Sequence, residues 1–378
     1  MSIKRVTVEA ALAALVDPNT SRPYADNKGI REVSIDGDTV SISVVLGYPA
    51  LSQHEDVRQR VAIALLDQVP GVRAAHVAVS QDIAAHTVQL GVKLLPNVKN
   101  IVAVASSKGG VGKSTTAVNL ALALAQEGTS VGILDADIYG PSLPTMLGVH
   151  GRPESPDDKS MNPLVGHGLQ ANSIGFLIDE DNPIVWRGPM ATSALEQLLR
   201  QTNWQDLDYL IVDMPPGTGD IQLTLAQRVP VTGAVIITTP QDIALLDAKK
   251  GLKMFEKVGI PILGIVENMS IHVCPNCGHE EHVFGAGGAA RMATDYNVPV
   301  LGSLPLDIAI REQADCGTPT VAAAPDSAVA ARYREIARQV AIAIADRAEY
   351  KRNIPLDCGS KWALLHNSSV NTQRHRRA

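Results

Sequence analysis

The sequence predicts an α/β protein: a doubly wound, mostly parallel sheet preceded by a small α+β domain. Of the 378 residues, 45% are hydrophobic and only 3% are aromatic, so the predicted core is large and aliphatic. In the longer C-terminal part, five apolar runs typical of buried strands alternate with helical patterns. This alternation is the βαβ signature of a parallel sheet with helices on both faces.

Residues 1–93 are predicted to form the small domain. Polar and apolar residues alternate on both sides of Asp36-Gly37-Asp38, which is typical of a β-hairpin. The expected elements are a helix from Val6 that ends at Asp17-Pro18, strands over 31–35 and 39–44, a helix over 57–65 and a strand over 87–92. The region contains no cysteine, so it offers no thiolate chemistry.

Residues 94–100 are interpreted as a linker, and residues 101–348 as the larger domain. Its buried strands are expected at 101–105, 131–134, 209–212, 234–237 and 262–266, and an amphipathic helix is expected over 329–344. Residues 349–378 lose this periodicity and end in a basic segment. We interpret them as a mobile tail, with a tether to an anionic surface as the alternative.

The most informative motif follows the first strand of the larger domain and reads Ser107-Lys108-Gly109-Gly110-Val111-Gly112-Lys113-Ser114-Thr115. Gly109, Gly110 and Gly112 are expected to adopt positive φ, which lets the backbone approach an anion closely. The N–H groups of the loop and of the following helix would then face phosphates. Catalytic Lys113 is expected to reach the β- and γ-phosphates, and Ser114 to ligate Mg²⁺.

This loop departs from the usual phosphate-binding pattern at one position and compensates at another. Ser107 stands where the pattern has its first glycine. A second lysine, Lys108, precedes the glycine pair. The two-lysine loop predicts that residues from Gly109 to Thr115 bind a nucleotide, with a glycine-rich turn and incidental lysines as the structural alternative.

Carboxylates end two of the predicted strands. Asp135 and Asp137 are expected to share one side because residues i and i+2 of a strand point the same way. One would then hold a Mg²⁺-bound water and the other orient the attacking water, unless both only cap nearby N–H groups. Asp213 ends an apolar strand as a Walker B aspartate does and is assigned to the Mg²⁺ shell. Beyond it, Gly217 is expected to offer its N–H to a γ-phosphate, and Asp220 to cap a helix.

Cys274 and Cys277 form a Cys-x-x-Cys loop that can place two sulfurs on one metal centre. Two ligands are too few for zinc or an iron–sulfur cluster, which usually have four. Three interpretations remain open from the residues alone. A second copy of the chain could complete a four-thiolate cluster site, His279 and His282 could complete a zinc site, or the pair could be a redox dithiol.

Composition indicates the cellular compartment and the classes of partner to expect. Four cysteines are too few for a disulfide framework, and no signal-peptide pattern follows Met1, so a reducing cytoplasm is expected. Packing or chance explains Cys316 and Cys358 better than ligation does. The sequence has no run of about 20 apolar residues, so no transmembrane helix is expected. The net charge of −6 argues against a general nucleic-acid binder.

The motifs together resemble one family. The larger domain resembles the Mrp/ApbC group of iron–sulfur cluster carriers, within the wider MinD/ParA class of P-loop NTPases. The first region resembles the MIP18-like module often found ahead of that ATPase. The matching segments are residues 108–115, Asp135-Ala136-Asp137-Ile138-Tyr139-Gly140-Pro141-Ser142, Asp213-Met214-Pro215-Pro216-Gly217-Thr218-Gly219-Asp220 and Cys274-Pro275-Asn276-Cys277.

The resemblance implies a homodimer that binds ATP with Mg²⁺, hydrolyses it slowly, receives a cluster from an assembly scaffold and passes it to apo-proteins. It implies that Lys108 reaches the nucleotide of the facing subunit, that Asp137 assists the attacking water and that Asn268 contacts adenine. It also implies that Cys274 and Cys277 of two subunits bridge a 4Fe–4S cluster. No nucleic-acid partner and no stable membrane association are expected.

Two other functions are consistent with much of the same sequence. A ParA/MinD-like positioning ATPase would need a C-terminal amphipathic helix or a basic DNA-binding face, and the tail after Arg352 has charges but no sustained apolar stripe. A zinc-stabilised ATPase would hold zinc, and no cluster, at the cysteine pair. Counting iron and sulfide against zinc separates the last interpretation from the first.

Overall fold

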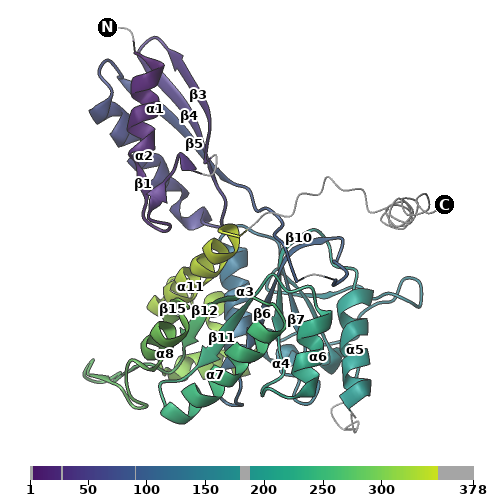
Figure 1. Cartoon of the computed structure of the whole chain (residues 1–378). Helices are drawn as coiled ribbons and strands as arrows, with labels where there is room; N and C mark the ends of the chain where they lie inside the picture. The colour runs from purple at the N-terminus through teal and green to yellow at the C-terminus, as the bar shows by residue number, and fades with distance from the viewer. Residues whose placement is uncertain (1–2, 27–28, 90, 179–187, 348–378) are drawn as a thin grey trace, which may run out of the picture.

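The chain folds into two lobes. The computed structural model describes residues 3–26, 29–89, 91–178 and 188–347. In Figure 1 the small N-terminal lobe stands above the larger lobe. Among these described residues, no helix combines the length and the apolarity that crossing a lipid bilayer would take. The predicted tail, residues 349–378, lies outside the described residues.

A three-stranded sheet with two helices on one face forms the small lobe (Figure 1). Its elements are α1 (Arg5–Ala13), β1 (Val16–Asp17), β2 (Arg22–Pro23), β3 (Ile30–Asp36), β4 (Thr39–Leu46), the 3₁₀ turn η2 (Leu51–Gln53), α2 (His54–Gln68) and β5 (Ala74–Gln81). The predicted hairpin is confirmed as β3 and β4, which pair antiparallel with Asp36 opposite Thr39. Every second residue of β4 is buried because the two helices cover that face.

Two predictions for this lobe are wrong. The third strand is β5, which pairs parallel with β4, whereas the described residues of the predicted strand, 87–89 and 91–92, form none. The described residues after β5 run along the larger lobe, where the Gln89 amide donates to the carbonyl oxygens of Ala226 and Val229 at 2.9 and 2.6 Å. Helix α1 also ends earlier than predicted, because the residues after it pair as β1 with β2.

The larger lobe is built on an eight-stranded sheet. Across the sheet the strand order is β15-β12-β11-β6-β10-β7-β9-β8. Only the edge pair β8 and β9 is antiparallel among these neighbours. The strands are β6 (Val98–Ala105), β7 (Val131–Asp135), β8 (Leu164–Gly166), β9 (Leu169–Ser173), β10 (Leu207–Asp213), β11 (Gly233–Thr238), β12 (Ile262–Glu267) and β15 (Val300–Ser303). The five predicted strands are confirmed as β6, β7, β10, β11 and β12, and the other three are additional.

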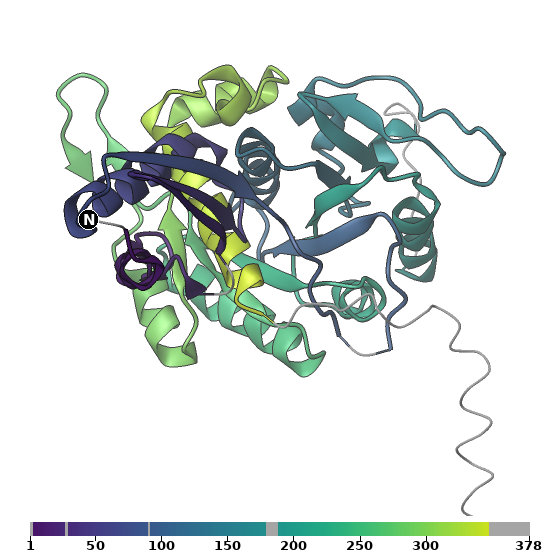
Figure 2. The same ribbon diagram turned by 90° about the horizontal axis from the view of Figure 1, so that it is seen from above.

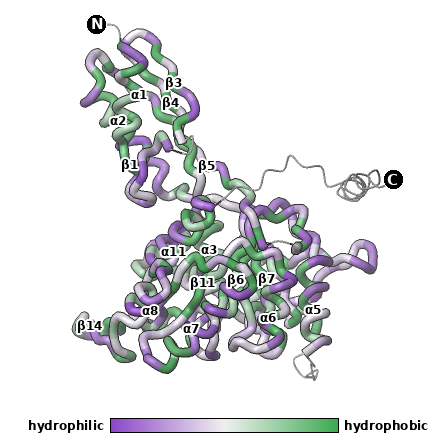
Figure 3. The backbone as a smooth tube through the Cα atoms, viewed as in Figure 1, coloured by the Kyte–Doolittle hydropathy of each residue, from purple (hydrophilic) through white to green (hydrophobic). Residues whose placement is uncertain are grey.

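Helices cover both faces of this sheet, which confirms the doubly wound architecture. They are α3 (Lys113–Gln126), α4 (Leu143–Leu147), the 3₁₀ turn η3 (Ile174–Phe176), α5 (Gly188–Gln201), α6 (Asp220–Arg228), α7 (Asp242–Lys257), α8 (Gly288–Tyr296), α9 (Ile308–Asp315), α10 (Thr320–Ala323) and α11 (Ala328–Ala345). On β6, Val102 and Val104 pack in the cluster with α3 and α11. Ile101, Ala103 and Ala105 point to the other face and pack in the cluster with α5, α6, α7 and α8. In Figure 3 the central strands are mainly hydrophobic.

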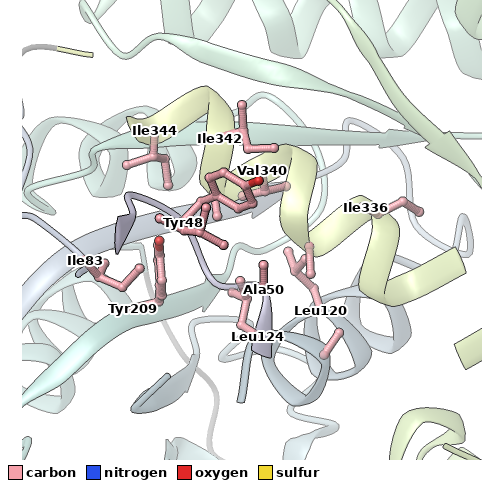
Figure 4. Packing of buried hydrophobic residues seen from close by; sticks show 14 of the residues in the cluster. Tyr48, Ala50, Ile83, Leu120, Leu124, Tyr209, Ile336, Val340, Ile342 and Ile344 are labelled. Carbon is pink, nitrogen blue, oxygen red and sulfur yellow. The ribbon is translucent and has the colours of Figure 1, made fainter. Parts of the chain in front are cut away.

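One hydrophobic cluster continues from the small lobe into the larger one. In the close view of Figure 4, Tyr48 and Ala50 from the small lobe lie among Leu124 of α3 and Val340 of α11. Tyr48 is 4% exposed and Ala50 is fully buried, so water is excluded from this contact. The cluster therefore packs the small lobe against two helices of the larger one.

A buried charge lies beside this apolar contact. Glu127, which caps the C-terminus of α3, is fully buried, and its carboxylate accepts hydrogen bonds from the Arg338 guanidinium of α11 at 2.7 Å and from the Ser52 hydroxyl at 2.7 Å. The Ser52 N–H also donates to this carboxylate, at 3.0 Å. The Gln81 side chain donates to the backbone carbonyl oxygens of Glu127 and Gly128. The small lobe thus contacts the end of α3 opposite to its phosphate-binding end.

Candidate functional site: a phosphate loop and a thiol hairpin

The phosphate loop lies where the sequence predicted it, between β6 and α3. Gly110 and Gly112 have φ of +81° and +83°, in the left-handed region, but Gly109 does not, so the prediction for Gly109 is wrong. A Cβ at Gly112 would lie 2.1 Å from the amide nitrogen of Asn268, so a larger residue does not fit there without moving that side chain. The loop therefore needs glycine for its turn and also for close packing.

Lys113 and Asp213 form a buried ion pair directly beside this loop. The Lys113 Nζ lies 2.5 Å from Asp213 Oδ1 and 3.0 Å from Ser114 Oγ. The side chains of Lys113 and Asp213 are only 6% and 4% exposed. Parallel pairing of β10 with β7 also places Asp213 opposite Asp135, so two carboxylates and one ammonium gather at the carboxyl ends of adjacent strands.

Asp135 organises the chain that follows β7. Its Oδ1 accepts a hydrogen bond from the N–H of Asp137 at 3.0 Å, and its Oδ2 accepts from the N–H of Ser142 at 3.0 Å, the N–H of Leu143 at 3.2 Å and the Ser173 hydroxyl at 3.1 Å. The carboxylate is fully buried. Burial, followed by the nearby charge of Asp213, raises the pKa of Asp135 to about 7.

This raised pKa predicts a pH dependence of stability. An acid with a higher pKa in the folded than in the unfolded state binds more protons when folded, so its contribution to stability grows as the pH falls from about 7 towards its unfolded value near 3.8. We expect Asp135→Asn to flatten the slope of the unfolding free energy across this pH interval, although it also weakens the hydrogen bonds. Urea unfolding across this interval measures the slope, and an unchanged slope in the variant would contradict the assignment.

The other predicted residues lie around this centre. Asp137 follows the end of β7, and burial raises its pKa although the Lys113 charge opposes the shift. Lys108 is exposed, and among the described residues no carboxylate pairs with it. Thr115 lies in the first turn of α3, where its carbonyl oxygen accepts from Asn119.

Two residues of the segment after β10 differ from expectation. The Gly217 N–H donates to the Ser106 carbonyl oxygen at 3.0 Å, so contact with a γ-phosphate would require this bond to be exchanged. Asp220 is the first residue of α6 and not its cap, because Gly219 takes the N-cap position without a side-chain hydrogen bond. A carboxylate in the first helical turn is still stabilised by the positive end of the helix dipole.

Two contacts in the site were not predicted from the sequence. Asn268 donates its side-chain amide to the Val111 carbonyl oxygen of the loop at 2.9 Å. Ser173 supports Asp135 from the end of β9, a short strand that no motif marked. Both contacts join residues far apart in the chain, so residue spacing gives no signal for them.

Cys274 and Cys277 lie at the tip of a small hairpin, between β13 (His272–Val273) and β14 (Glu280–Glu281). The Cys274 N–H donates to the His279 carbonyl oxygen and the Gly278 N–H to the Cys274 carbonyl oxygen, each at 2.9 Å. In Figures 1 and 2 the hairpin projects from the body of the larger lobe, and β14 is labelled there in Figure 3. Cys277 is exposed and Cys274 is partly exposed.

The electrostatics of the hairpin favour a thiolate at Cys274. The backbone N–H groups of Asn276 and Cys277, and then the Cys277 side chain, lower the pKa of the Cys274 thiol. Among the residues that the structure describes, no group of three or more His, Cys, Asp or Glu side chains could hold a metal ion. His282 instead has its Nδ1 2.8 Å from the Ser270 carbonyl oxygen. The hairpin therefore offers two sulfur ligands, and the described residues do not gather His279 and His282 with them as the single-chain zinc alternative requires.

Comparison with known proteins identifies the family of this chain. Residues 97–341 match the family model described as NUBPL iron-transfer P-loop NTPase, which is more than half of the chain. The chain belongs to this family. Ahead of its NUBPL-type NTPase part, residues 5–79 match a second model, described as an iron-sulfur cluster assembly protein.

Named relatives of this NUBPL-type NTPase agree with that match. An iron-sulfur cluster carrier protein of Escherichia coli (strain K12) is 53% identical over 338 residues, which cover 89% of this chain and 91% of that protein. An iron-sulfur cluster transfer protein, NUBPL, of Mus musculus is 54% identical over 250 residues, covering 66% and 78%. A solved nucleotide-binding protein from Archaeoglobus fulgidus, in complex with ADP, has a TM-score of 0.53 and 37% identity over 58% of this chain and 87% of that one.

Proposed function

We propose that the protein is an iron–sulfur cluster carrier that binds a cluster through Cys274 and Cys277 and transfers it to apo-proteins. The observation that carries the proposal is a pair of thiols on a projecting hairpin, one of which, Cys274, has a lowered pKa, joined to a P-loop NTPase of the iron-transfer family. Exposed thiolates are suited to handing over a cluster because a client's ligands can approach them. The names of the relatives from Escherichia coli and Mus musculus support the same function.

The second part of the proposal is that two copies share one cluster. The described residues of one chain supply two sulfurs at the hairpin and no third ligand beside them, whereas an iron–sulfur cluster generally takes four thiolates. A two-fold axis would bring two identical pairs together. We propose that this homodimer carries a 4Fe–4S cluster, obtains it from an assembly scaffold, and works in the cytoplasm without a nucleic-acid partner or stable membrane association.

The third part concerns ATP. In the proposed roles, Lys113 contacts the β- and γ-phosphates, the residues from Gly109 to Thr115 surround them, and Asn268 contacts adenine. Asp137 orients the attacking water, and exposed Lys108 reaches across the dimer to the facing nucleotide. The Gly217 N–H would turn from Ser106 to the γ-phosphate, so hydrolysis would release it again. We propose that hydrolysis is slow.

The donor set of the loop fits Mg²⁺. Ser114 Oγ and Asp213 Oδ1 both lie within 3.0 Å of the same cationic atom, Lys113 Nζ, so their lone pairs converge on a site for positive charge. Hydroxyl and carboxylate oxygens are the ligands that Mg²⁺ prefers. When bound, the ion would neutralise charge on the phosphates. Since four donors already use the Asp135 carboxylate, we place Asp135 in the outer part of the Mg²⁺ shell, where it would contact bound water.

Replacing both hairpin cysteines by serine tests the proposal. We expect the Cys274→Ser, Cys277→Ser protein to lose its iron, its sulfide and its visible absorbance after anaerobic reconstitution, because a hydroxyl does not replace a thiolate on iron. ATP affinity should stay within about a factor of two, since the loop is unchanged. Cys316→Ser is the matched control because Cys316 is also exposed and lies outside the hairpin.

Metal analysis and co-sedimentation separate the cluster carrier from the two alternative functions. Iron that remains in the double variant would disprove the ligand assignment. One zinc per chain, with no sulfide, in the anaerobically prepared wild-type protein would instead establish the zinc-stabilised ATPase. ATP-dependent co-sedimentation with lipid vesicles or DNA would support the positioning ATPase.

A further inference from the structure

We infer that Met269 and His282 are positioning residues that transmit the nucleotide state of the phosphate loop to the geometry of the cysteine pair. This inference rests on the proposed function, because it explains how ATP and the cluster site communicate. The observation behind this inference is a short series of residues and hydrogen bonds that connects the phosphate loop to the hairpin. It runs from the loop carbonyl of Val111 through Asn268, Met269 and Ser270 to the hairpin.

The path begins with the hydrogen bond between the Asn268 amide and the Val111 carbonyl oxygen, 2.9 Å long and buried. The contact is tight, because a Cβ on the neighbouring Gly112 would lie 2.1 Å from the same amide nitrogen. The Asn268 N–H is also tied to the Thr238 carbonyl oxygen of β11 at 2.8 Å. Any rearrangement of the loop around phosphates therefore acts on the Asn268 side chain.

Met269 makes this connection able to switch. Its φ is +56°, in the left-handed region that residues other than glycine rarely adopt. Such a conformation persists only where the surroundings hold it, and Asn268 and Ser270 on either side supply those contacts. Ser270 is held by two hydrogen bonds to the Leu304 carbonyl oxygen, from its N–H and its hydroxyl, each at 3.0 Å. If the Asn268 contact changes, the strained residue is where the backbone can rotate.

The other end of the path is the root of the hairpin. The Nδ1 of His282 lies 2.8 Å from the Ser270 carbonyl oxygen, so the residue after β14 is joined to the residue that follows Met269. The other strand is fixed to the body: Leu306 donates its N–H to the Ile271 carbonyl oxygen at 2.7 Å, and His272 Nδ1 lies 3.1 Å from the Leu306 carbonyl oxygen. A rotation at Met269 would therefore shift the root of the hairpin, where His282 contacts Ser270.

The consequence concerns the two sulfurs. Cys274 lies only six positions after Asn268, a span of at most about 20 Å when extended. The hairpin is closed at its tip by the paired bonds between Cys274, Gly278 and His279, so a shift at its root reorients the tip as a unit. Nucleotide binding would then change the exposure and orientation of the thiol pair.

Alkylation kinetics of the full-length, reduced, cluster-free protein test this. In a Cys316→Ser, Cys358→Ser background, only the hairpin thiols react, and their rates are measured by mass spectrometry with and without Mg·ATP. We expect the nucleotide to change the rate on the order of fivefold in this background. Met269→Gly, in which glycine adopts positive φ freely, and His282→Ala should each bring the ratio of the two rates close to one.

His279→Ala is the matched control, because this histidine belongs to the same hairpin and among the described residues no hydrogen bond to its ring is found. It should keep the ratio of the background protein. Circular dichroism and ATP titration show that each variant is folded and binds nucleotide. The inference is overturned if Met269→Gly and His282→Ala keep the ratio, or if ATP leaves the background rate unchanged. Iron and sulfide analysis of the same proteins tests the proposed function separately, since a protein can bind a cluster without this coupling.

Discussion

Lys113→Ala is expected to lower ATP turnover by about 10²–10³-fold and to destabilise the protein as well. The catalytic loss follows from removing a cation aimed at developing charge on the phosphates. The destabilisation follows from the ion pair, because truncating one partner of a buried pair leaves the other charge unpaired, at about 3–5 kcal/mol. Here Asp213 would remain buried opposite Asp135 with no ammonium between them.

The stability loss should depend on pH. With the ammonium gone, the two facing carboxylates favour proton uptake, so the variant should lose less stability at about pH 5 than at about pH 8. Urea unfolding at both pH values measures this, alongside phosphate release for turnover. Lys108→Ala is the control on the same loop, and because Lys108 is exposed its stability should change by less than about 0.5 kcal/mol. Equal losses of stability in the two variants would contradict the buried pair.

Arg338→Ala is expected to destabilise the protein by about 3 kcal/mol and to loosen the small lobe. It removes the only cation that the described residues bring within ion-pair distance of Glu127, whose side chain is fully buried. The two hydrogen bonds from Ser52 remain, which is why we place the effect at the lower end of the range for broken buried pairs. Thermal unfolding measures the loss, and hydrogen exchange in η2 measures the loosening.

Two further variants separate charge from packing. The double variant Glu127→Gln, Arg338→Met removes the charge pair but keeps side-chain volume, and it should recover much of the stability. Arg332→Ala removes an exposed arginine from the same helix and should change stability by less than about 0.5 kcal/mol. If the Arg332 and Arg338 variants lose stability equally, the buried charge is not what holds this contact.

The sequence was most informative where structure is decided locally. Buried parallel strands are continuous apolar runs, so β6, β7, β10, β11 and β12 were predictable. β5 was missed because Ala74-Ala75-His76 begins it without strong strand formers, and the alternating residues 87–92 were mistaken for it. That segment is held along the larger lobe by Gln89, a long-range contact that local pattern does not reveal.

The same division applies to the site. The loop, its lysine and the two strand-terminal carboxylates were predictable because each follows a strand directly. The hydrogen bonds around these residues were less predictable. Gly217 donates to Ser106 and Asn268 donates to the loop, and both bonds join segments brought together only by the sheet. Ser173 had no signal at all, since a serine at the end of a short strand matches no pattern.

The apolar cluster that runs from Tyr48 and Ala50 into α3 and α11 has a consequence for how the protein comes apart. The sequence suggests a clear boundary between the two lobes, but their interiors are continuous, because residues of both lobes are buried in the same hydrophobic cluster. Removing the N-terminal lobe would expose a hydrophobic face of the NTPase lobe to water. We therefore expect the two parts to unfold together, and an isolated NTPase lobe to need polar replacements on that face.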